Sequence, residues 1–231
     1  MAGFNPVIEN IDESMLALIT PFSLVLAGPS GSGKSKFLFD LIDNLDTCTK
    51  PKIEKVIFIY GVYQELYKKY PNIHFTDNLE YMKVRPSENT LLILDDCMSQ
   101  VKDSILLEQL FTRGRHENIS VILVLQSMFY KGAVLKTVRD NATYMAITNH
   151  IQDQTRLYTF SSQLELKNSS YFIDSYEDAM KTRYNYLFVD LHPKSQMRDA
   201  PYFIKYRTGV AKIHGQTLYV DAKKYKNVCT Q

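Results

Sequence analysis

The residues best suited to chemistry lie near the amino terminus, in the stretch FSLVLAGPSGSGKS from Phe22 to Ser35. It has the spacing G-x-x-x-x-G-K-[ST], preceded by an apolar run and followed by a segment with helical apolar spacing. Glycines let the backbone N–H groups of such a loop converge on phosphate oxygens, and the helix beginning there adds its partial positive charge. The stretch therefore predicts a phosphate-binding loop (P-loop) for a nucleotide.

Individual residues of this loop have separate expected tasks. Lys34 can reach the β- and γ-phosphates, the Ser35 hydroxyl can bind Mg²⁺, and Pro29 stiffens the entry to the loop. The residues expected to contact the nucleotide are Gly28, Pro29, Ser30, Gly31, Ser32, Gly33, Lys34 and Ser35.

Two acids end another apolar run, LLILDD from Leu91 to Asp96, which has the form of a Walker B segment. An acid pair at the end of a buried strand is costly without a compensating partner. We expect Asp95 to hold Mg²⁺ together with Ser35, and Asp96 to accept a proton from the attacking water or to orient it.

The elements that position these groups follow from the apolar pattern. Continuous apolar runs predict five buried strands, at residues 22–27, 55–60, 90–96, 120–125 and 143–147. Helical apolar spacing predicts helices between them, at residues 34–44, 104–112 and 134–139. This alternation indicates an α/β fold with a mainly parallel sheet flanked by helices.

Smaller elements are expected around this core. Short helices are predicted at residues 11–19, 63–70 and 78–83, and a minor edge strand at 73–76. Beyond residue 150 we expect helices at 153–163 and 175–182 and tyrosine-rich strands at 184–191, 202–206 and 218–220, pairing antiparallel at the sheet edge. We interpret residues 1–231 as one domain, with a core at about 20–150 and an extension at about 151–231.

Charge is unevenly distributed along the chain. From Lys181 onward there are ten basic and three acidic residues, a net charge of +7, so the preceding residues carry −5. A basic carboxyl-terminal quarter is compatible with binding to nucleic-acid phosphates, and equally with a solvated face of edge strands.

Cysteine content and hydropathy narrow the cellular setting. The three cysteines, Cys48, Cys97 and Cys229, show no paired spacing, which argues against a disulfide framework or a zinc site. No apolar run reaches the length of a membrane span, and the start MAGFNPVIEN lacks the features of a secretory signal. We therefore expect an intracellular protein that is not secreted and has no membrane span.

The order of the motifs carries further information. A complete strand at 55–60 lies between the P-loop helix and the Walker B strand, and the strand at 120–125 ends in Gln126. This pattern resembles the additional-strand, catalytic-acid division of P-loop ATPases, which implies a RecA-like fold with the core strand order 5-1-4-3-2. In that division Gln126 matches the polar sensor residue that contacts the γ-phosphate or the water.

Within that division the chain resembles the FtsK–HerA superfamily, specifically the poxvirus-type genome-packaging ATPases of DNA viruses. The resemblance is carried by GPSGSGKS at 28–35, LLILDD at 91–96, FTRGRHENISVILVLQS at 111–127 and VRDNATYMAIT at 138–148. One departure is Asp96, where much of the superfamily has glutamate. The resemblance implies ATP and Mg²⁺ as cofactors and a homo-oligomeric ring, hexameric or pentameric, that pumps double-stranded DNA into a preformed capsid. It also implies capsid proteins as partners, in the host cytoplasm or nucleus or associated with the virion.

An arginine-rich corner follows the helix after the Walker B segment. Arg115 matches the Arg-His of the family's motif and is expected to complete the active site of a neighbouring subunit, with Arg113 and Arg139 as alternatives. A structural interpretation instead pairs Arg113 and Arg115 with Glu117 or with the end of the helix. DNA contacts are expected either from the loop at 129–136 or from the basic tail.

P-loops also occur in proteins whose function is not ATP-driven translocation. A GTPase is disfavoured because no Asn-Lys-x-Asp motif stands at a strand end. A nucleotide or small-molecule kinase needs an arginine-bearing lid and a second substrate site, whereas paired acids with Gln126 suit water activation better. A nucleotide-dependent assembly protein that binds ATP without hydrolysing it stays open.

Overall fold

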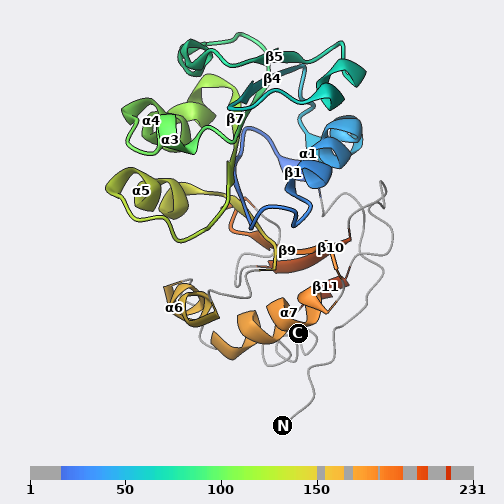
Figure 1. Cartoon of the computed structure of the whole chain (residues 1–231), viewed down its shortest axis with the longest axis vertical. Helices are drawn as coiled ribbons and strands as arrows, with labels where there is room; N and C mark the ends of the chain where they lie inside the picture. The colour runs from blue at the N-terminus through green and yellow to red at the C-terminus, as the bar shows by residue number, and fades with distance from the viewer. Residues whose placement is uncertain are drawn as a thin grey trace.

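The computed structural model describes residues 17–149, 154–163, 169–181, 183–194, 202–207 and 217–219. In this part of the chain one large sheet runs through the molecule, and helices cover both of its faces (Figure 1). The sheet contains the strands β2 (Ser23–Ala27), β4 (Lys55–Tyr60), β5 (His74–Thr76), β6 (Thr90–Asp95), β7 (Ile119–Leu125), β8 (Tyr144–Ile147), β9 (Asn185–Asp190), β10 (Tyr202–Arg207) and β11 (Thr217–Tyr219).

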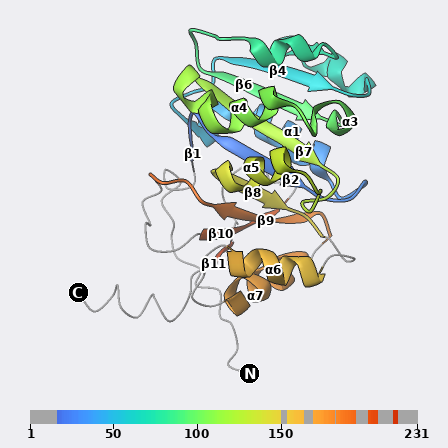
Figure 2. The ribbon, with the colours of Figure 1, turned by 90° about the vertical axis from the view of Figure 1, so that its left-hand side faces the viewer.

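The strand order is β11-β10-β9-β8-β2-β7-β6-β4-β5, which can be followed along the sheet in Figure 2. Neighbours from β5 to β8 pair in parallel, whereas β8–β9, β9–β10 and β10–β11 pair antiparallel. When β2, β4, β6, β7 and β8 are counted as strands one to five, this order contains 5-1-4-3-2. The predicted RecA-like α/β fold, with antiparallel edge strands in the carboxyl-terminal part, is confirmed.

Ten helical segments connect the described strands. They are α1 (Lys34–Asp43), α2 (Leu45–Cys48), η2 (Glu65–Lys69), η3 (Leu79–Lys83), α3 (Met98–Val101), α4 (Ile105–Arg113), η4 (Gly114–Glu117), α5 (Ala133–Asn141), α6 (Gln154–Gln163) and α7 (Ser169–Met180), where η denotes a 3₁₀ helix. In Figure 1, α4, α5 and α6 lie on one side of the sheet and α1 on the other.

The core is divided into two layers by the sheet, because successive side chains of a strand point to opposite faces. On β2, Val25 and Ala27 join the apolar cluster that includes α4, α5, α6 and α7, whereas Leu24 and Leu26 join the cluster that includes α1 and η2. Every residue of β2, β6, β7 and β8 is buried. Such continuous burial explains why these strands appear in the sequence as unbroken apolar runs.

The expected helix at residues 11–19 is wrong where the structure describes it. Leu18–Ile19 form β1, which pairs in parallel with β3 (Thr49–Lys50) in a separate two-stranded sheet. The N–H of Ile19 donates to the Tyr144 hydroxyl over 3.0 Å. Long-range partners therefore determine this backbone, and helical spacing of apolar residues does not reveal them.

Among the described residues, no helix combines the length and the apolar character needed to cross a membrane.

His192, which follows β9, is a buried histidine in a cationic setting at the end of the sheet opposite the P-loop. Its ring stacks on Tyr144 with 5.7 Å between centroids, and its Nδ1 accepts from the Lys194 N–H over 3.1 Å. Burial, together with the charges of Arg115 and Lys194, lowers the pKa of His192 to about 4. The folded protein therefore holds this imidazole neutral.

We predict that His192 makes folding sensitive to mild acid. In the unfolded chain the imidazole takes up a proton near pH 6.5, and in the folded chain only near pH 4. The contribution of the neutral imidazole to the free energy of unfolding is therefore complete above about pH 6.5 and is lost as the pH falls. Replacing His192 by Gln should reduce the loss of unfolding free energy between pH 7 and pH 5 by on the order of 1 kcal/mol, measured by urea denaturation. The exposed His116→Gln variant is the control, and an unchanged pH dependence in His192→Gln would contradict this account.

Candidate functional site

The carboxyl ends of the parallel strands bring most of the predicted site residues into one cleft of about 530 Å³. Its lining includes P-loop residues, both acids that follow the Walker B run and the residue that ends β7. These are Ser30, Gly31, Gly33, Lys34, Ser35, Asp95, Asp96 and Gln126, joined by Lys36, Gln64, Met98, Ser99, Val124, Leu125 and Tyr130. Gly28, Pro29 and Ser32 belong to the same loop, but they do not line this cleft.

The P-loop glycines serve different physical needs. Gly31 and Gly33 have φ angles of 74° and 99°, in the region where a Cβ is strained. Gly28 is needed for space: a Cβ there would lie 1.7 Å from Thr148 Oγ1, at the end of β8. The loop is thus packed closely against the strand next to β2.

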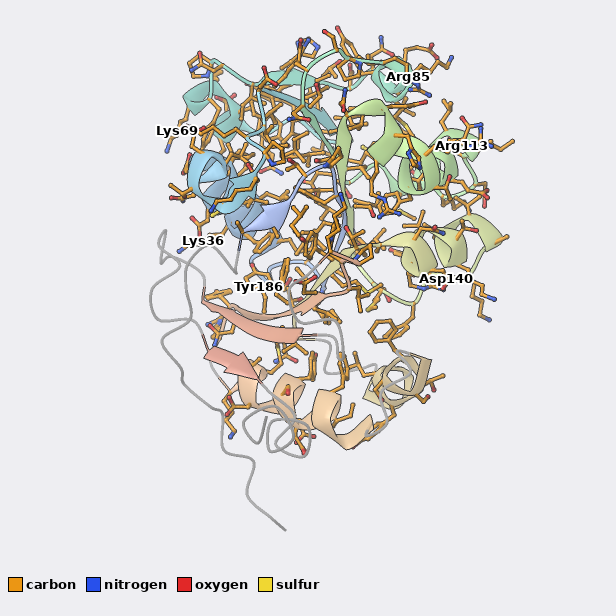
Figure 3. The ribbon with its side chains drawn as sticks, turned by 180° about the vertical axis from the view of Figure 1, so that it is seen from behind. Lys36, Lys69, Arg85, Arg113, Asp140 and Tyr186 are labelled. Carbon is orange, nitrogen blue, oxygen red and sulfur yellow. The ribbon has the colours of Figure 1, made fainter. Side chains whose placement is uncertain are left out.

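Tyr186 on β9 supports the loop from the same side. This buried side chain donates a hydrogen bond to the carbonyl oxygen of Gly33, and its ring lies 5.1 Å from that of Phe37 on α1. In Figure 3 Tyr186 lies inside the molecule, between β9 and α1. A strand beyond the parallel core therefore holds the start of the P-loop helix.

Charges are concentrated where the loop faces β6. The Lys34 ammonium donates to the carbonyl oxygens of Gly28 and Pro29 over 2.7 and 2.8 Å. Burial lowers the pKa of Lys34, although the charges of Asp95 and Asp96 act in the opposite direction. Burial and the neighbouring Asp96 raise the pKa of Asp95, against the effect of Lys34. Two carboxylates thus lie near one ammonium, and of these groups Asp95 is buried, Lys34 is half-buried and Asp96 is exposed.

Asp96 projects from a tight turn at the end of β6. Its φ of 56° lies in the left-handed region, which is uncommon for residues other than glycine. Gly61 makes room for this turn, because a Cβ there would lie 2.0 Å from the backbone oxygen of Asp96. The turn sends the Asp96 carboxylate toward β7, where the Gln126 amide Nε2 donates to its Oδ1 over 3.4 Å.

The donor set fits one divalent cation held in part by a nucleotide. The described residues contain no cluster of three or more His, Cys, Asp or Glu side chains that would make an all-protein metal cage. Mg²⁺ commonly takes one or two carboxylates and completes its shell with phosphates and water. Asp95 and the Ser35 hydroxyl line the same cleft, and the excess negative charge of the two acids favours a cation there.

Arg139 has a contact of its own within the chain. Its guanidinium donates to the carbonyl oxygens of Met128 and Tyr130 over 3.2 and 3.1 Å. These bonds fasten the segment after β7 to α5, and Tyr130 in that segment lines the cleft.

Arg115 is not brought to the cleft of its own chain. It lies in η4, before β7, whereas Gln126 follows the other end of that strand, so seven strand residues, roughly 20 Å, separate them. Arg113, the last residue of α4, lies at the outer surface on the opposite side of the molecule from Lys36 (Figure 3). Glu117 pairs with Arg85 over 2.7 Å. This pair contradicts the alternative interpretation, in which Glu117 pairs with Arg113 or Arg115.

Sequence reasoning missed three residues that shape the site: Gly61 at the Asp96 turn, and Thr148 and Tyr186 at the P-loop. Thr148 carried the only available signal, a polar residue directly after a predicted buried strand. Gly61 and Tyr186 act through pairs 35 and 153 positions apart in the chain, which a local motif cannot indicate.

We predict that adding one methyl group at Gly28 destabilises the whole domain. Gly28→Ala should cost about 1–3 kcal/mol through overpacking against Thr148, seen as a melting temperature lower by several degrees. The second change Thr148→Ala should recover part of the loss, because it removes the nearest atom and Thr148 Oγ1 has no hydrogen-bond partner within the described chain. A melting temperature equal to that of the parent protein in Gly28→Ala alone would refute the close packing.

Comparisons with known proteins agree with this geometry. Residues 73–190 match the family described as Poxvirus A32 protein, and this range contains Asp95, Asp96 and Gln126. DNA packaging protein OPG160 of Variola virus is 34% identical over 130 residues, which cover 46% of each chain, and the Vaccinia virus protein matches equally. The chain spans about half the length of the curated relatives it matches.

A solved structure shares the fold. The genome packaging NTPase B204 from Sulfolobus turreted icosahedral virus 2, in complex with ATP-gammaS, superposes with a TM-score of 0.51 at 18% sequence identity, covering 74% of this chain and 92% of that chain. The family match extends over just over half of the 231 residues and includes the strands that carry both acids and Gln126. On this basis the chain belongs to the Poxvirus A32 protein family.

Proposed function

We propose that this protein hydrolyses ATP and uses the reaction to move double-stranded viral DNA into a preformed capsid. The observation that carries the proposal is the contact between Gln126 Nε2 and Asp96 Oδ1, in the same cleft as Lys34 and Asp95. It is supported by membership in the Poxvirus A32 protein family and by relatives that are named DNA packaging proteins. A structure of the same fold, that of a genome packaging NTPase, was determined with ATP-gammaS.

In this proposal the P-loop binds the triphosphate of ATP. The N–H groups of residues 28–35 surround the phosphates, and the Lys34 ammonium exchanges its two carbonyl partners for the β- and γ-phosphate oxygens. Exchange of carbonyl oxygens for charged phosphate oxygens favours binding because charge-assisted hydrogen bonds are the stronger ones.

Asp96 and Gln126 act on the water that attacks the γ-phosphate. Gln126 orients Asp96 through its amide, and the Asp96 carboxylate accepts a hydrogen bond or a proton from that water. Asp95 and Ser35 would hold Mg²⁺, which would supply positive charge to the triphosphate.

The wider assembly follows from the family. We propose a homo-oligomeric ring, hexameric or pentameric, around double-stranded DNA, acting with capsid proteins in the host cytoplasm or nucleus or in association with the virion. The DNA contacts are assigned either to Lys131, before α5, and Lys136, within it, or to the basic tail with Lys223, Lys224 and Lys226, which lies outside the described residues.

We predict that substitutions in the cleft separate nucleotide binding from hydrolysis. Phosphate release should rise when double-stranded DNA is added to the parent protein and should be abolished in Lys34→Ala. Asp96→Asn should still bind ATP but hydrolyse it about 10²–10⁴-fold more slowly, whereas Asp95→Asn should lose its response to Mg²⁺.

Asp46→Asn is the matched control, because Asp46 is an exposed acid that pairs with Lys52 on the surface. Equal loss of ATP binding in Asp95→Asn and Asp96→Asn would show that the two roles are wrongly divided. Transfer of phosphate to a small acceptor, or ATP binding with no phosphate release in the parent protein, would favour a kinase or an assembly protein instead.

Arg115 is proposed to stabilise the γ-phosphate bound by the neighbouring subunit. A guanidinium roughly a strand length from its own P-loop has no access to its own nucleotide, but it can reach across a ring interface. Arg139 is less suited, because its guanidinium already holds the segment that contains Met128 and Tyr130.

We predict complementation between two inactive variants. Arg115→Ala and Lys34→Ala should each lack ATPase activity alone, yet mixed rings should recover part of it, because some intact P-loops then lie beside an intact Arg115. Arg113→Ala is the matched control and should retain most of its activity. Mixed rings that form but stay inactive would mean that Arg115 acts within its own subunit or only structurally.

A further inference from the structure

A second cavity, of about 220 Å³, lies beside the P-loop and is separate from the cleft that holds the acids. Its walls come from the loop itself and from the segment at the end of α7 and the start of β9. The lining residues are Pro29, Ser30, Gly31, Ser32, Asn149, Met180, Arg183, Tyr184 and Asn185. Pro29 and Ser32, which do not line the larger cleft, therefore line this cavity.

The sheet order determines which part of a nucleotide can reach this cavity. β2 lies between β7 on one side and β8 on the other, and β9 follows β8. A γ-phosphate that faces Asp95, Asp96 and Gln126 points toward β6 and β7. The other end of the triphosphate, with its nucleoside, then leaves the loop on the side of β8 and β9.

The cavity offers a flat aromatic surface at this place. Tyr184 is 43% exposed, and the Arg183 guanidinium lies over its ring, 4.9 Å from the centroid. The φ of Tyr184 is 65°, a backbone conformation that is an outlier for a bulky residue. Such strained residues concentrate at ligand sites, where the position of the side chain matters more than the strain.

Unpaired polar atoms surround the same place. Among the described residues, the buried side-chain atoms without a hydrogen-bond partner are Ser32 Oγ, Thr148 Oγ1 and Asn185 Oδ1. Ser32 and Asn185 line the cavity, and the Asn185 amide nitrogen already donates to the Ala179 carbonyl over 3.2 Å. Asn185 therefore keeps an acceptor, Oδ1, without a partner at the wall of the cavity.

We infer that this cavity is the nucleoside subsite, in which the base stacks on Tyr184 with Arg183 beside it. This inference rests on the proposed function, because it assumes that the P-loop binds the triphosphate of the same nucleotide. Stacking of a base on an aromatic side chain, helped by an arginine, contributes affinity that is independent of the phosphates. Tyr184 is then a specificity residue for the base, and Lys34 serves the triphosphate.

The first experiment compares ATP with inorganic tripolyphosphate, which has the phosphates but no base. In the full chain, Tyr184→Asn should weaken ATP binding roughly ten-fold and leave tripolyphosphate binding unchanged. Asparagine tolerates a φ of 65° better than tyrosine does, so the variant should fold at least as well. Lys34→Ala should lose both ligands.

These outcomes separate the subsite from the proposed function. If Tyr184→Asn binds ATP as tightly as the parent protein while Lys34→Ala has lost both ligands, the subsite is wrong and the P-loop function stands. Equal weakening of both ligands by Tyr184→Asn would also overturn the subsite, because the ring would then support the loop rather than a base. Normal binding of both ligands by Lys34→Ala would overturn the proposed function together with the inference.

The second experiment uses fluorescence, because the chain contains no tryptophan. In Tyr184→Trp, ATP should change the tryptophan emission and tripolyphosphate should not. Tyr158→Trp is the matched control, since Tyr158 is 54% exposed on α6 and lines neither cavity. If the tryptophan emission of Tyr184→Trp does not change at ATP concentrations where ATP binds, base stacking is contradicted.

Discussion

The chemistry of the site depends on two opposite charges placed near each other, the buried Asp95 carboxylate and the Lys34 ammonium. Asp95 is buried and Lys34 is partly buried, and each shifts the pKa of the other toward the charged form, against the effect of burial. Asp96 adds a second negative charge, so the two acids together attract a cation more strongly than Asp95 near Lys34 would alone. This arrangement requires β2 and β6 to lie in one sheet with β7 between them, and the parallel core provides that.

Much of this fold is encoded locally and was therefore predictable. Runs buried on both faces, such as the whole of β7, appear as unbroken apolar sequence, and the P-loop has a fixed spacing because its backbone must surround phosphate. The cleft formed by Lys34, Asp95, Asp96 and Gln126 follows from these elements, since parallel strands present their carboxyl ends at one edge.

The residues that support the P-loop and the Asp96 turn were not predictable, for a physical reason. Gly61, Thr148 and Tyr186 each act through contact with a strand or loop distant in the chain, and without that contact the residue types of Gly61 and Tyr186 have no special meaning. Leu18 and Ile19 show the same limitation, because their pairing with Thr49 and Lys50 overrides a helical apolar pattern. Here tertiary contacts decide the local backbone, as intrinsic propensities are weak by comparison.

The antiparallel addition of β9 has a consequence for the behaviour of the chain in solution. All four residues of β8 are buried, and β9 covers the side of this strand that faces away from β2. A shortened chain ending after β8 would present an apolar strand with unpaired N–H and C=O groups, which is a template for aggregation. The parallel core expressed alone would therefore aggregate. A truncated chain should retain β9 to stay monodisperse.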